Sequence, residues 1–422
     1  MNSLLEQLKN QPLNDLSKGL PFGNKVAPSN VKEQHWNILR GDLPFPSLLL
    51  KESVLDYNLK TMAEWCADNN LLLAPHGKTT MSPQIYERQL AHGAWAITIA
   101  NIAQAMVCAR FGVRRIVIAN QIVGAGNLRA LAALMNSDDA LELYCLVDSV
   151  EGVHHLAEGL RQHHVTRSIN VFIECGRQGW RTGIRDEAQA LQVYDAISQH
   201  PTLLNFSGVE AFEGSASSPN HLEEARDVDE FFEVMKGIAD RLTQNWNQTE
   251  RPIFSIGGTA YLDRVLLMSR NLTDNYRVVV RSGCYVTHDH GAYDKKQKNA
   301  RLRLPEMPEF KTAFELWSYV QSRPQPDLAF LTFGKRDAPY DLDLPFPLYV
   351  YANGEKQELH DAVIKKMNDQ HAYMSINPAQ TLHIGDLVCC GISHPCTAFD
   401  KWRVLPVVDD EYNVLDLYVT FF

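Results

Sequence analysis

Between about residue 54 and residue 280, short apolar runs alternate with longer segments of helical periodicity. In the first helical segment, Val54–Asn69, large apolar residues recur at spacings of three and four, which is typical of a helix with one buried face. The apolar runs are rich in branched side chains and bounded by glycine, proline or polar residues, as buried parallel strands are. Eight strands are predicted, at Leu71–Ala74, Ala94–Thr98, Arg115–Ala119, Leu141–Val147, Ile169–Glu174, Phe206–Ala211, Ile253–Ile256 and Arg277–Val280.

The helices predicted between these strands complete a regular alternation. Eight strands alternating with helices predict an α/β fold, a (β/α)8 barrel of the TIM type. An open, doubly wound sheet is the alternative fold with the same alternation. The predicted helices are Pro83–His92, a helix ending near Phe111, Leu128–Met135, Val150–Arg161, Glu187–His200, His221–Leu242 and Tyr261–Ser269.

The pattern changes after about Tyr293. Prolines interrupt short runs of β character, such as Phe346–Tyr351 and Leu387–Gly391, and the final stretch Tyr412–Phe421 is rich in valine and aromatic residues. We therefore expect a mostly β C-terminal domain, which a strand at Pro46–Leu50 would join. The predicted division is an N-terminal segment 1–54 that partly joins the β domain, a barrel 55–293 and the β domain 294–422.

Composition and charge narrow the class of function. A chain of 422 residues with 45% hydrophobic residues suits more than one domain and a large core. Its formal net charge of −10 argues against a nucleic acid or an anionic membrane as the main partner. No apolar run is long enough to cross a membrane, and the N-terminus is amphipathic rather than a signal peptide. Eight cysteines are too few for a disulfide framework, so we expect buried free thiols in a soluble cytoplasmic protein.

The segment Leu71–Met81, LLLAPHGKTTM, carries the first candidate for chemistry. Its apolar run ends just before Lys78, which places this lysine at the carboxyl end of a strand, where barrel enzymes keep their active sites. Apolar surroundings favour the neutral form of a lysine amine, which attacks carbonyl groups. From this segment alone, a surface lysine ahead of a helix that begins at Pro83 is the simpler interpretation.

Two glycine-containing turns follow the seventh and eighth predicted strands. They are Ser255–Thr259, SIGGT, and Arg281–Tyr285, RSGCY. Barrel enzymes commonly bind a phosphate at this position, because glycine lets backbone N–H groups converge on an anion. The Thr259 hydroxyl could add a donor. Ordinary tight turns are the alternative interpretation, but two such turns after these two strands favour an anion site.

A third loop, Glu174–Gly183, follows the fifth strand and contains Arg177 and Arg181. These arginines could meet an anion or a cofactor oxygen, and surface ion pairs are the alternative. The sequence contains no GxGxxG, P-loop, HExxH or GxSxG motif that would indicate a nucleotide-binding, zinc-protease or serine-hydrolase site.

The β region contains a pair of candidate metal ligands. In extended backbone, the side chains of His394 and Cys396 would project to the same side, and both types are good ligands for zinc. A lone pair of this kind is usually not a metal site. The segment His288–His290, HDH, is interpreted as a loop near the site rather than as the ligand set.

Several of these motifs occur together, in this order, in a known family. The chain resembles the alanine racemase-like, fold-type III enzymes that use pyridoxal phosphate, in the branch of the D-serine dehydratases and D-threonine aldolases, and within it the bacterial D-serine deaminase-like proteins. One departure is Thr332-Phe333-Gly334, where many relatives carry Asp-x-Gly. The matching pieces are Pro75-His76-Gly77-Lys78-Thr79, Arg181-Thr182-Gly183, Gly257-Gly258-Thr259, Gly283-Cys284-Tyr285, Gly334-Lys335-Arg336-Asp337 and the segment HPCTAFDKW at 394–402.

The resemblance implies a role for each matching position. Lys78 would form the Schiff base with pyridoxal phosphate, and Arg181 would lie near the phenolic oxygen of the cofactor. His394 and Cys396 would bind zinc, as in the dehydratase, whereas the aldolases typically carry His-x-Asp. The remaining cofactor-binding residues would be His76, Tyr285 and, mainly through backbone N–H groups that hold the phosphate, Gly257, Gly258, Thr259, Gly283 and Cys284.

The implied activity is a zinc-assisted deamination of a D-β-hydroxy amino acid, such as D-serine or D-threonine, to a 2-oxo acid and ammonia. Lys78 would also be the general base at Cα, and zinc would make the β-hydroxyl a better leaving group. The alternatives are retro-aldol cleavage to glycine and an aldehyde, and cofactor binding without turnover; a racemase has no use for the His-x-Cys pair. The D preference comes from the resemblance alone. Enzymes of this fold are generally homodimers, so we expect one here.

Overall fold

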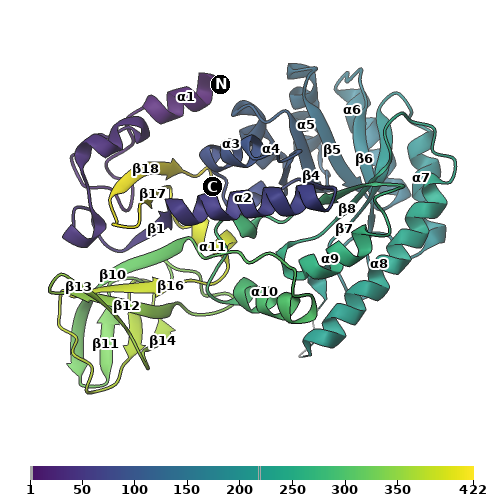
Figure 1. Cartoon of the computed structure of the whole chain (residues 1–422). Helices are drawn as coiled ribbons and strands as arrows, with labels where there is room; N and C mark the ends of the chain where they lie inside the picture. Colours follow the sequence, from purple (N-terminus) through teal and green to yellow (C-terminus); the bar gives the residue numbers. More distant parts are fainter. Residues whose placement is uncertain (1–2, 217, 219) are drawn as a thin grey trace.

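The computed structural model describes residues 3–216, 218 and 220–422, and it contains two large sheets. One is an eight-stranded parallel sheet surrounded by helices, and the other is a ten-stranded, mostly antiparallel sheet beside it (Figure 1). The predicted α/β fold, a TIM-type barrel with a mostly β C-terminal domain, is confirmed.

The parallel sheet curls into a barrel. Its spatial order is β2-β9-β8-β7-β6-β5-β4-β3, so that neighbours in sequence are neighbours in the sheet. The two edge strands meet because the Trp95 N–H donates to the Leu73 carbonyl (2.7 Å) and the Thr98 N–H donates to the Pro75 carbonyl (2.9 Å). This closure excludes the open doubly wound sheet. The strands are β2 (Leu71–Leu73), β3 (Ile97–Ile99), β4 (Arg115–Gln121), β5 (Glu142–Val147), β6 (Ile169–Cys175), β7 (Leu204–Ala211), β8 (Ile253–Ile256) and β9 (Arg277–Val280).

Eight helices surround the barrel, within a few residues of the predicted positions (Figure 1). Several begin at a side chain that accepts a hydrogen bond from a first-turn backbone N–H, as helix caps do: Asn101, Ser149, Asp186 and Asn220. The helices are α2 (Glu52–Asp68), α3 (Pro83–Ala91), α4 (Ile102–Arg110), α5 (Ala125–Ser137), α6 (Val150–Gln162), α7 (Glu187–Ser198), α8 (His221–Thr243) and α9 (Leu262–Ser269).

Alternate residues of the barrel strands belong to two separate hydrophobic clusters. Val117, Leu146 and Phe172 belong to the smaller cluster, which fills the barrel interior, and Tyr144 stacks on Phe172 with ring centroids 5.2 Å apart. Their strand neighbours, such as Ile118, pack outward in the larger cluster with the helices. Because both faces of each strand are buried, the strands appear in the sequence as continuous apolar runs.

The second sheet joins both ends of the chain. Its path is β13-β12-β16-β10-β1-β17-β18, and β11, β15 and β14 extend it from β10. The predicted strand near Pro46–Leu50 is β1, which lies between β10 and β17. The strands are β1 (Ser47–Lys51), β10 (Phe314–Gln325), β11 (Leu328–Leu331), β12 (Phe346–Ala352), β13 (Glu355–Glu358), β14 (Val363–Met367), β15 (Ala372–Ser375), β16 (Leu387–Gly391), β17 (Val404–Val408) and β18 (Val414–Val419).

Two helices near the barrel mouth differ from the expectation. Helix α10 (Ala292–Arg303) was not predicted, because only Ala300 on it is buried and the helix therefore lacks an apolar stripe. The extended backbone expected around His394 is wrong. His394 has a left-handed φ of 58°, and the short helix α11 (Pro395–Phe399) begins immediately after it.

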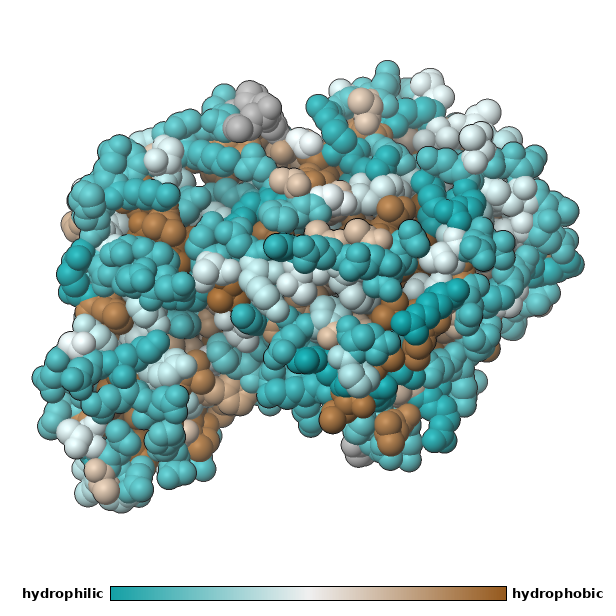
Figure 2. Space-filling model, in the orientation of Figure 1, coloured by the Kyte–Doolittle hydropathy of each residue, from teal (hydrophilic) through white to brown (hydrophobic). Residues whose placement is uncertain are grey.

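The predicted domain divisions stay predictions, and both lie inside helices, the first in α2 and the second in α10. The face shown in Figure 2 is mainly hydrophilic with scattered hydrophobic patches. None of the helices in the described residues is long and apolar enough to cross a membrane. The remaining elements are α1 (Ser3–Asn10), η1 (Pro28–Gln34), η2 (Ile38–Arg40), η3 (Gly77–Thr79), η4 (Glu213–Ser215), η5 (Thr259–Tyr261) and η6 (Cys284–Val286).

Candidate active site at the carboxyl end of the barrel

A cavity of about 340 Å³ lies at the carboxyl ends of the barrel strands, beside the loop that carries His394. It brings together residues from strands at both ends of the predicted series and from the β region. All of the predicted site residues except Tyr285 line it. The lining residues are His76, Lys78, Thr79, Ala100, Ala119, Asn120, Arg181, Phe212, Gly257, Gly258, Thr259, Arg281, Gly283, Cys284, Tyr293, His394 and Cys396.

Lys78 lies half-buried in the cavity wall, in the turn η3 that follows β2. The Tyr86 hydroxyl holds this turn by donating to the Gly77 carbonyl (2.8 Å). Helix α3 begins only at Pro83, so Lys78 is not the first-turn lysine of that helix. Within the described residues the Lys78 amine has no hydrogen-bond or ion-pair partner in the structure, which leaves it available to a ligand.

His76 precedes this turn and also lines the cavity. Its Nδ1 is buried and has no hydrogen-bond partner among the described residues. Burial lowers the pKa of His76 well below its usual value, and the charges of Lys78 and two arginines add to the effect. A neutral imidazole with one unsatisfied nitrogen is therefore at the cavity wall.

The two glycine turns lie on the same side of the cavity. Gly283 approaches the first turn so closely that a Cβ atom there would be 2.5 Å from the His76 carbonyl oxygen. Only glycine fits at this contact, which brings the start of η6 against the start of η3. Gly257, Gly258 and Thr259 line the cavity next to this contact.

A buried arginine stands between the two turns, and sequence reasoning missed it. Arg281 is 3% exposed and forms an ion pair with Glu210 of β7. Its guanidinium also donates to the Ser255 hydroxyl (2.5 Å) and to the Ala211 carbonyl (2.8 Å). Burial raises the pKa of Glu210 to about 7, while the positive charge of Arg281 opposes the rise. Arg281 directly precedes the Ser-Gly-Cys turn, and its place as the residue after the eighth strand was the available signal.

The loop after β6 separates its two arginines. Arg181 lines the cavity, where its guanidinium lies 4.5 Å from the centroid of the Phe212 ring. Arg177 instead donates to the Asp227 carbonyl on α8 (3.2 Å). The buried carboxylate of Glu174 anchors the loop by accepting a hydrogen bond from the Thr182 hydroxyl (2.8 Å). One arginine of the two thus faces the cavity, and the other makes the surface contact.

His394 and Cys396 face the cavity although their backbone is not extended. The His394 N–H donates to Asp289 Oδ2 (2.9 Å), and its Nδ1 forms a very short contact with Asp341 Oδ2. Asp341 also accepts from the Thr397 hydroxyl (2.8 Å). These two carboxylates hold the backbone and the ring of His394, which turns its other ring nitrogen toward Cys396.

Cys396 lies among several polar groups. Its Sγ is 3.7 Å from the Cys284 Sγ and 3.4 Å from the Thr79 hydroxyl, next to Lys78. The hydrogen bond from Cys284 is the main cause that lowers the pKa of Cys396 well below its usual value, and the hydrogen bond to Cys396 raises the pKa of His394 to about 9. No three His, Cys, Asp or Glu side chains in the described part of the chain converge on a metal position.

The segment His288–His290 lies beside the site, as predicted, and its aspartate organises it. Asp289 is fully buried and its Oδ1 accepts hydrogen bonds from the N–H groups of Gly291 (3.0 Å), Tyr293 (3.0 Å) and Asp294 (3.2 Å). Asp289 therefore caps α10 with one oxygen and holds His394 with the other. Tyr293, which sequence reasoning missed together with α10, lines the cavity.

Tyr285 is the predicted site residue that does not reach the cavity. Its side chain is 1% exposed in the hydrophobic core, packed edge-on against Phe310 with ring centroids 5.9 Å apart. Its hydroxyl lies 3.5 Å from Gln89 on α3. The side chain of the residue after Cys284 therefore points into the core, and a role of Tyr285 in binding the cofactor stays a prediction.

Comparisons with known proteins agree with this geometry. The family model described as "Alanine racemase, N-terminal domain" matches residues 52–274, more than half of the chain, and the model described as "Putative serine dehydratase domain" matches residues 313–408. The chain is 25% identical over 367 residues to a D-threonine aldolase from Arthrobacter sp, covering 86% of this chain and 89% of the relative.

Two solved structures share the fold. One is a D-threonine aldolase from Filomicrobium marinum, with 21% identity, a TM-score of 0.75, and 90% of this chain and 95% of that chain covered. The other is a D-threo-3-hydroxyaspartate dehydratase from Delftia sp. HT23, with 18% identity, a TM-score of 0.72, and 91% and 99% covered. The chain therefore belongs to the alanine racemase-like, fold-type III family of pyridoxal-phosphate enzymes, in the D-serine dehydratase branch.

Proposed function

We propose that the protein is a pyridoxal-phosphate-dependent lyase that deaminates a D-β-hydroxy amino acid, such as D-serine or D-threonine, to a 2-oxo acid and ammonia. The observation that carries the proposal is that the Lys78 amine and the His394–Cys396 pair line one cavity together with the two glycine turns. The names of the relatives support a lyase acting on D-amino acids. A carrier of the cofactor would need no pair of metal ligands beside the lysine.

The residues of the cavity fit pyridoxal phosphate. Lys78 supplies an amine with no partner in the described structure, and the Gly283 contact forms a narrow cradle that a Cβ atom would fill. Arg181 is available to the phenolic oxygen, and Arg281 is a buried, permanently charged donor available to the ring nitrogen. The phosphate would be held by Gly257, Gly258, Thr259, Gly283 and Cys284.

The cofactor, when bound, supplies an electron sink for negative charge at Cα. The free amine of Lys78 would take the proton from Cα as general base. His394 and Cys396 would hold a zinc ion, whose Lewis acidity weakens the bond to the β-hydroxyl. Asp341 and Asp289 would keep His394 in the orientation that this requires.

Retro-aldol cleavage is the second candidate, because the Arthrobacter relative is named a D-threonine aldolase. Cys396 rather than an aspartate favours the dehydratase. The experiment is to supply D-threonine to the purified protein and to identify the products. We expect 2-oxobutanoate and ammonia, in a reaction that chelation of the metal abolishes. Predominant glycine and acetaldehyde would replace the first proposal by the second, and no turnover of either kind would leave a cofactor-binding protein.

The homodimer expected from the resemblance is also a proposal. Sedimentation equilibrium of the purified protein tests it, and a mass of one chain at micromolar concentration would contradict it.

A further inference from the structure

A buried carboxylate touches the glycine turn after β8. Glu213 belongs to η4, in the loop between β7 and α8, and its side chain is fully buried. Its Oε1 accepts a hydrogen bond from the Gly258 N–H at 2.9 Å. Its Oε2 is also buried and has no hydrogen-bond partner among the described residues. A carboxylate oxygen without a partner in a dry site is costly, so the arrangement calls for a functional explanation.

The contact extends to the other glycine of the turn. Gly257 has a left-handed φ of 79°, and a Cβ atom there would lie 2.9 Å from Glu213 Oε1. The carboxylate thus lies against the backbone of both Gly257 and Gly258. Since Gly258 N–H is one of the donors proposed for the cofactor phosphate, Glu213 already uses a hydrogen bond that the phosphate needs.

We infer that Glu213 is an internal competitor for the phosphate site, and that the cofactor phosphate binds only when this carboxylate swings off the Gly258 N–H or becomes neutral. The inference rests on the proposed function, because it assumes that the turn binds the phosphate of pyridoxal phosphate. Two anions that share one backbone donor repel each other more strongly in a buried site than in bulk water.

The charges around Glu213 determine how it responds to pH. Arg281, just after β9, and Arg181 of the β6–α7 loop favour its ionised form, and Glu210 of β7 disfavours it. The Tyr261 hydroxyl of η5 is a further titratable neighbour. Burial outweighs these attractions and raises the pKa of Glu213 to about 7. A neutral Glu213 is therefore well populated near pH 6, where it neither repels the phosphate nor binds Gly258 as strongly.

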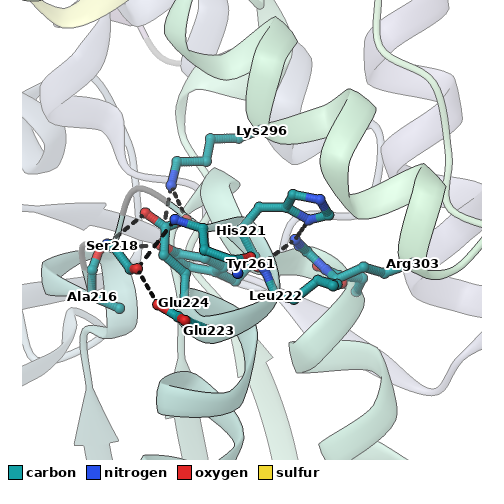
Figure 3. Close-up of polar contacts among 11 residues, drawn as sticks. Ala216, Ser218, His221, Leu222, Glu223, Glu224, Tyr261, Lys296 and Arg303 are labelled. Carbon is teal, nitrogen blue, oxygen red and sulfur yellow. Dashed lines mark hydrogen bonds and ion pairs between the residues drawn. The ribbon is translucent and has the colours of Figure 1, made fainter.

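Residues between Glu213 and α8 make several polar contacts, which Figure 3 shows. The Tyr261 hydroxyl donates to the Ala216 carbonyl (3.1 Å), and the Ser218 N–H donates to Glu224 Oε1 (3.2 Å). Lys296 of α10 holds the other oxygen of Glu224 at 2.6 Å and also contacts the Tyr261 hydroxyl (3.2 Å). With Ala216 held by η5 and Ser218 held by α8, rotation or protonation of the Glu213 side chain is a smaller change than opening of the loop.

The test compares the full-length, cofactor-stripped protein with Glu213→Gln and Glu213→Ala, and with Glu233→Gln on the exposed face of α8 as a control of equal charge change. Dissociation constants are measured by absorption and equilibrium dialysis for pyridoxal phosphate and for pyridoxal, which lacks the phosphate. We expect Glu213→Gln to bind pyridoxal phosphate about tenfold more tightly than the parent at pH 8 and pyridoxal equally well. The gain should shrink at pH 6, and Glu233→Gln should change nothing.

Unchanged or weaker binding of pyridoxal phosphate in both Glu213 variants would overturn the inference and assign Glu213 a purely structural role in the turn. An equal gain for pyridoxal would also overturn it, because the effect would then not involve the phosphate. Failure of the proposed function looks different: the parent itself would bind no pyridoxal phosphate, or its binding would be unaffected by Lys78→Ala.

Discussion

The barrel side and the β side of the cavity are built in different ways. On the barrel side, backbone N–H groups, a half-buried lysine and the fully buried pair Arg281–Glu210 come from the ends of neighbouring parallel strands. On the β side, His394 and Cys396 come from one short segment with a left-handed residue, and two carboxylates from elsewhere in the chain hold it. We call these two sides the barrel wall and the β wall. The barrel wall is formed by the ends of the parallel strands, and the β wall depends on a few side chains.

The difference suggests a division of labour. Rigid backbone donors suit a cofactor that stays bound, and a pair of side chains oriented from behind suits a metal whose remaining positions are open. Changes on the barrel side should therefore alter cofactor binding, and changes on the β side should alter the reaction of a cofactor that is still bound. Four experiments test this difference between the two sides of the cavity.

The largest effect is expected for Lys78→Ala. If Lys78 is both the covalent anchor and the general base, as we propose, turnover of D-serine should fall by at least about 10³-fold. The visible absorption of the bound cofactor should disappear with it. Lys60→Ala, at an exposed position on α2, is the control and should retain both signals. Turnover that persists in Lys78→Ala would contradict the assignment.

A smaller loss with a different signature is expected for His394→Ala. Elimination should fall by roughly 10² to 10³-fold because one of the two proposed metal ligands is missing, while the visible absorption of the cofactor stays as in the parent. Zinc per chain, measured by atomic absorption after dialysis, should fall in parallel. If the cofactor is lost together with the metal, the two walls are not independent, and the proposal that changes on the β side leave the cofactor bound is wrong.

Asp341→Asn tests whether metal binding on the β wall depends on the contact of Asp341 with the His394 ring. The amide keeps the shape of the carboxylate but removes its charge from the contact with His394 Nδ1, so zinc affinity should weaken by about 10 to 100-fold. Competition with a chromogenic chelator measures this affinity. Asp361→Asn is a matched control, because Asp361 is exposed and its left-handed backbone accepts asparagine. Equal affinities in the two variants would remove Asp341 from the site.

The smallest expected effect concerns the free energy of unfolding of the protein without cofactor, to which the buried Glu213 contributes. The pKa of Glu213 is raised from 4.5 to about 7, so between these pH values the folded chain keeps a proton that the unfolded chain has lost. This contribution to stability is present below pH 4.5 and is lost as pH rises through 7. The free energy of unfolding of Glu213→Gln should therefore rise relative to that of the parent by roughly 1 to 2 kcal/mol when the pH is raised from 5 to 8. Urea unfolding at both pH values measures it, and a gain independent of pH would contradict it.

The two walls also differ in how far the sequence could predict them. The barrel strands and most of their site residues were predictable, because parallel strands buried on both faces produce continuous apolar runs that end at the active edge. The ion pair between Arg281 and Glu210 was not predictable, because Glu210 lies two strands away in the sheet and nothing local marks the pair. The side-chain direction of Tyr285 depends in the same way on the core that surrounds it.

On the β wall the residue types were recognisable and their conformation was not. Nothing in the segment around His394 announces a left-handed residue, because that conformation is stabilised by a hydrogen bond to Asp289, 105 residues earlier in the chain. Helix α10 was not predicted for a related reason. Its first N–H groups donate hydrogen bonds to Asp289 and its side chains form ion pairs, but it has no hydrophobic stripe. Asp341 could be assigned to the site only once the fold had brought it to His394.

The position of β1 in the second sheet has a consequence for synthesis on the ribosome. Leu48, Leu49 and Leu50 are fully buried between β10 and β17, so this strand, which is made before the barrel, waits for partners that are made after the barrel. The barrel, whose strands pair in sequence order, can form while β1 is still unpaired. A nascent chain therefore exposes a very apolar strand throughout elongation, and we expect chaperone dependence or aggregation to rise when translation stalls before residue 404.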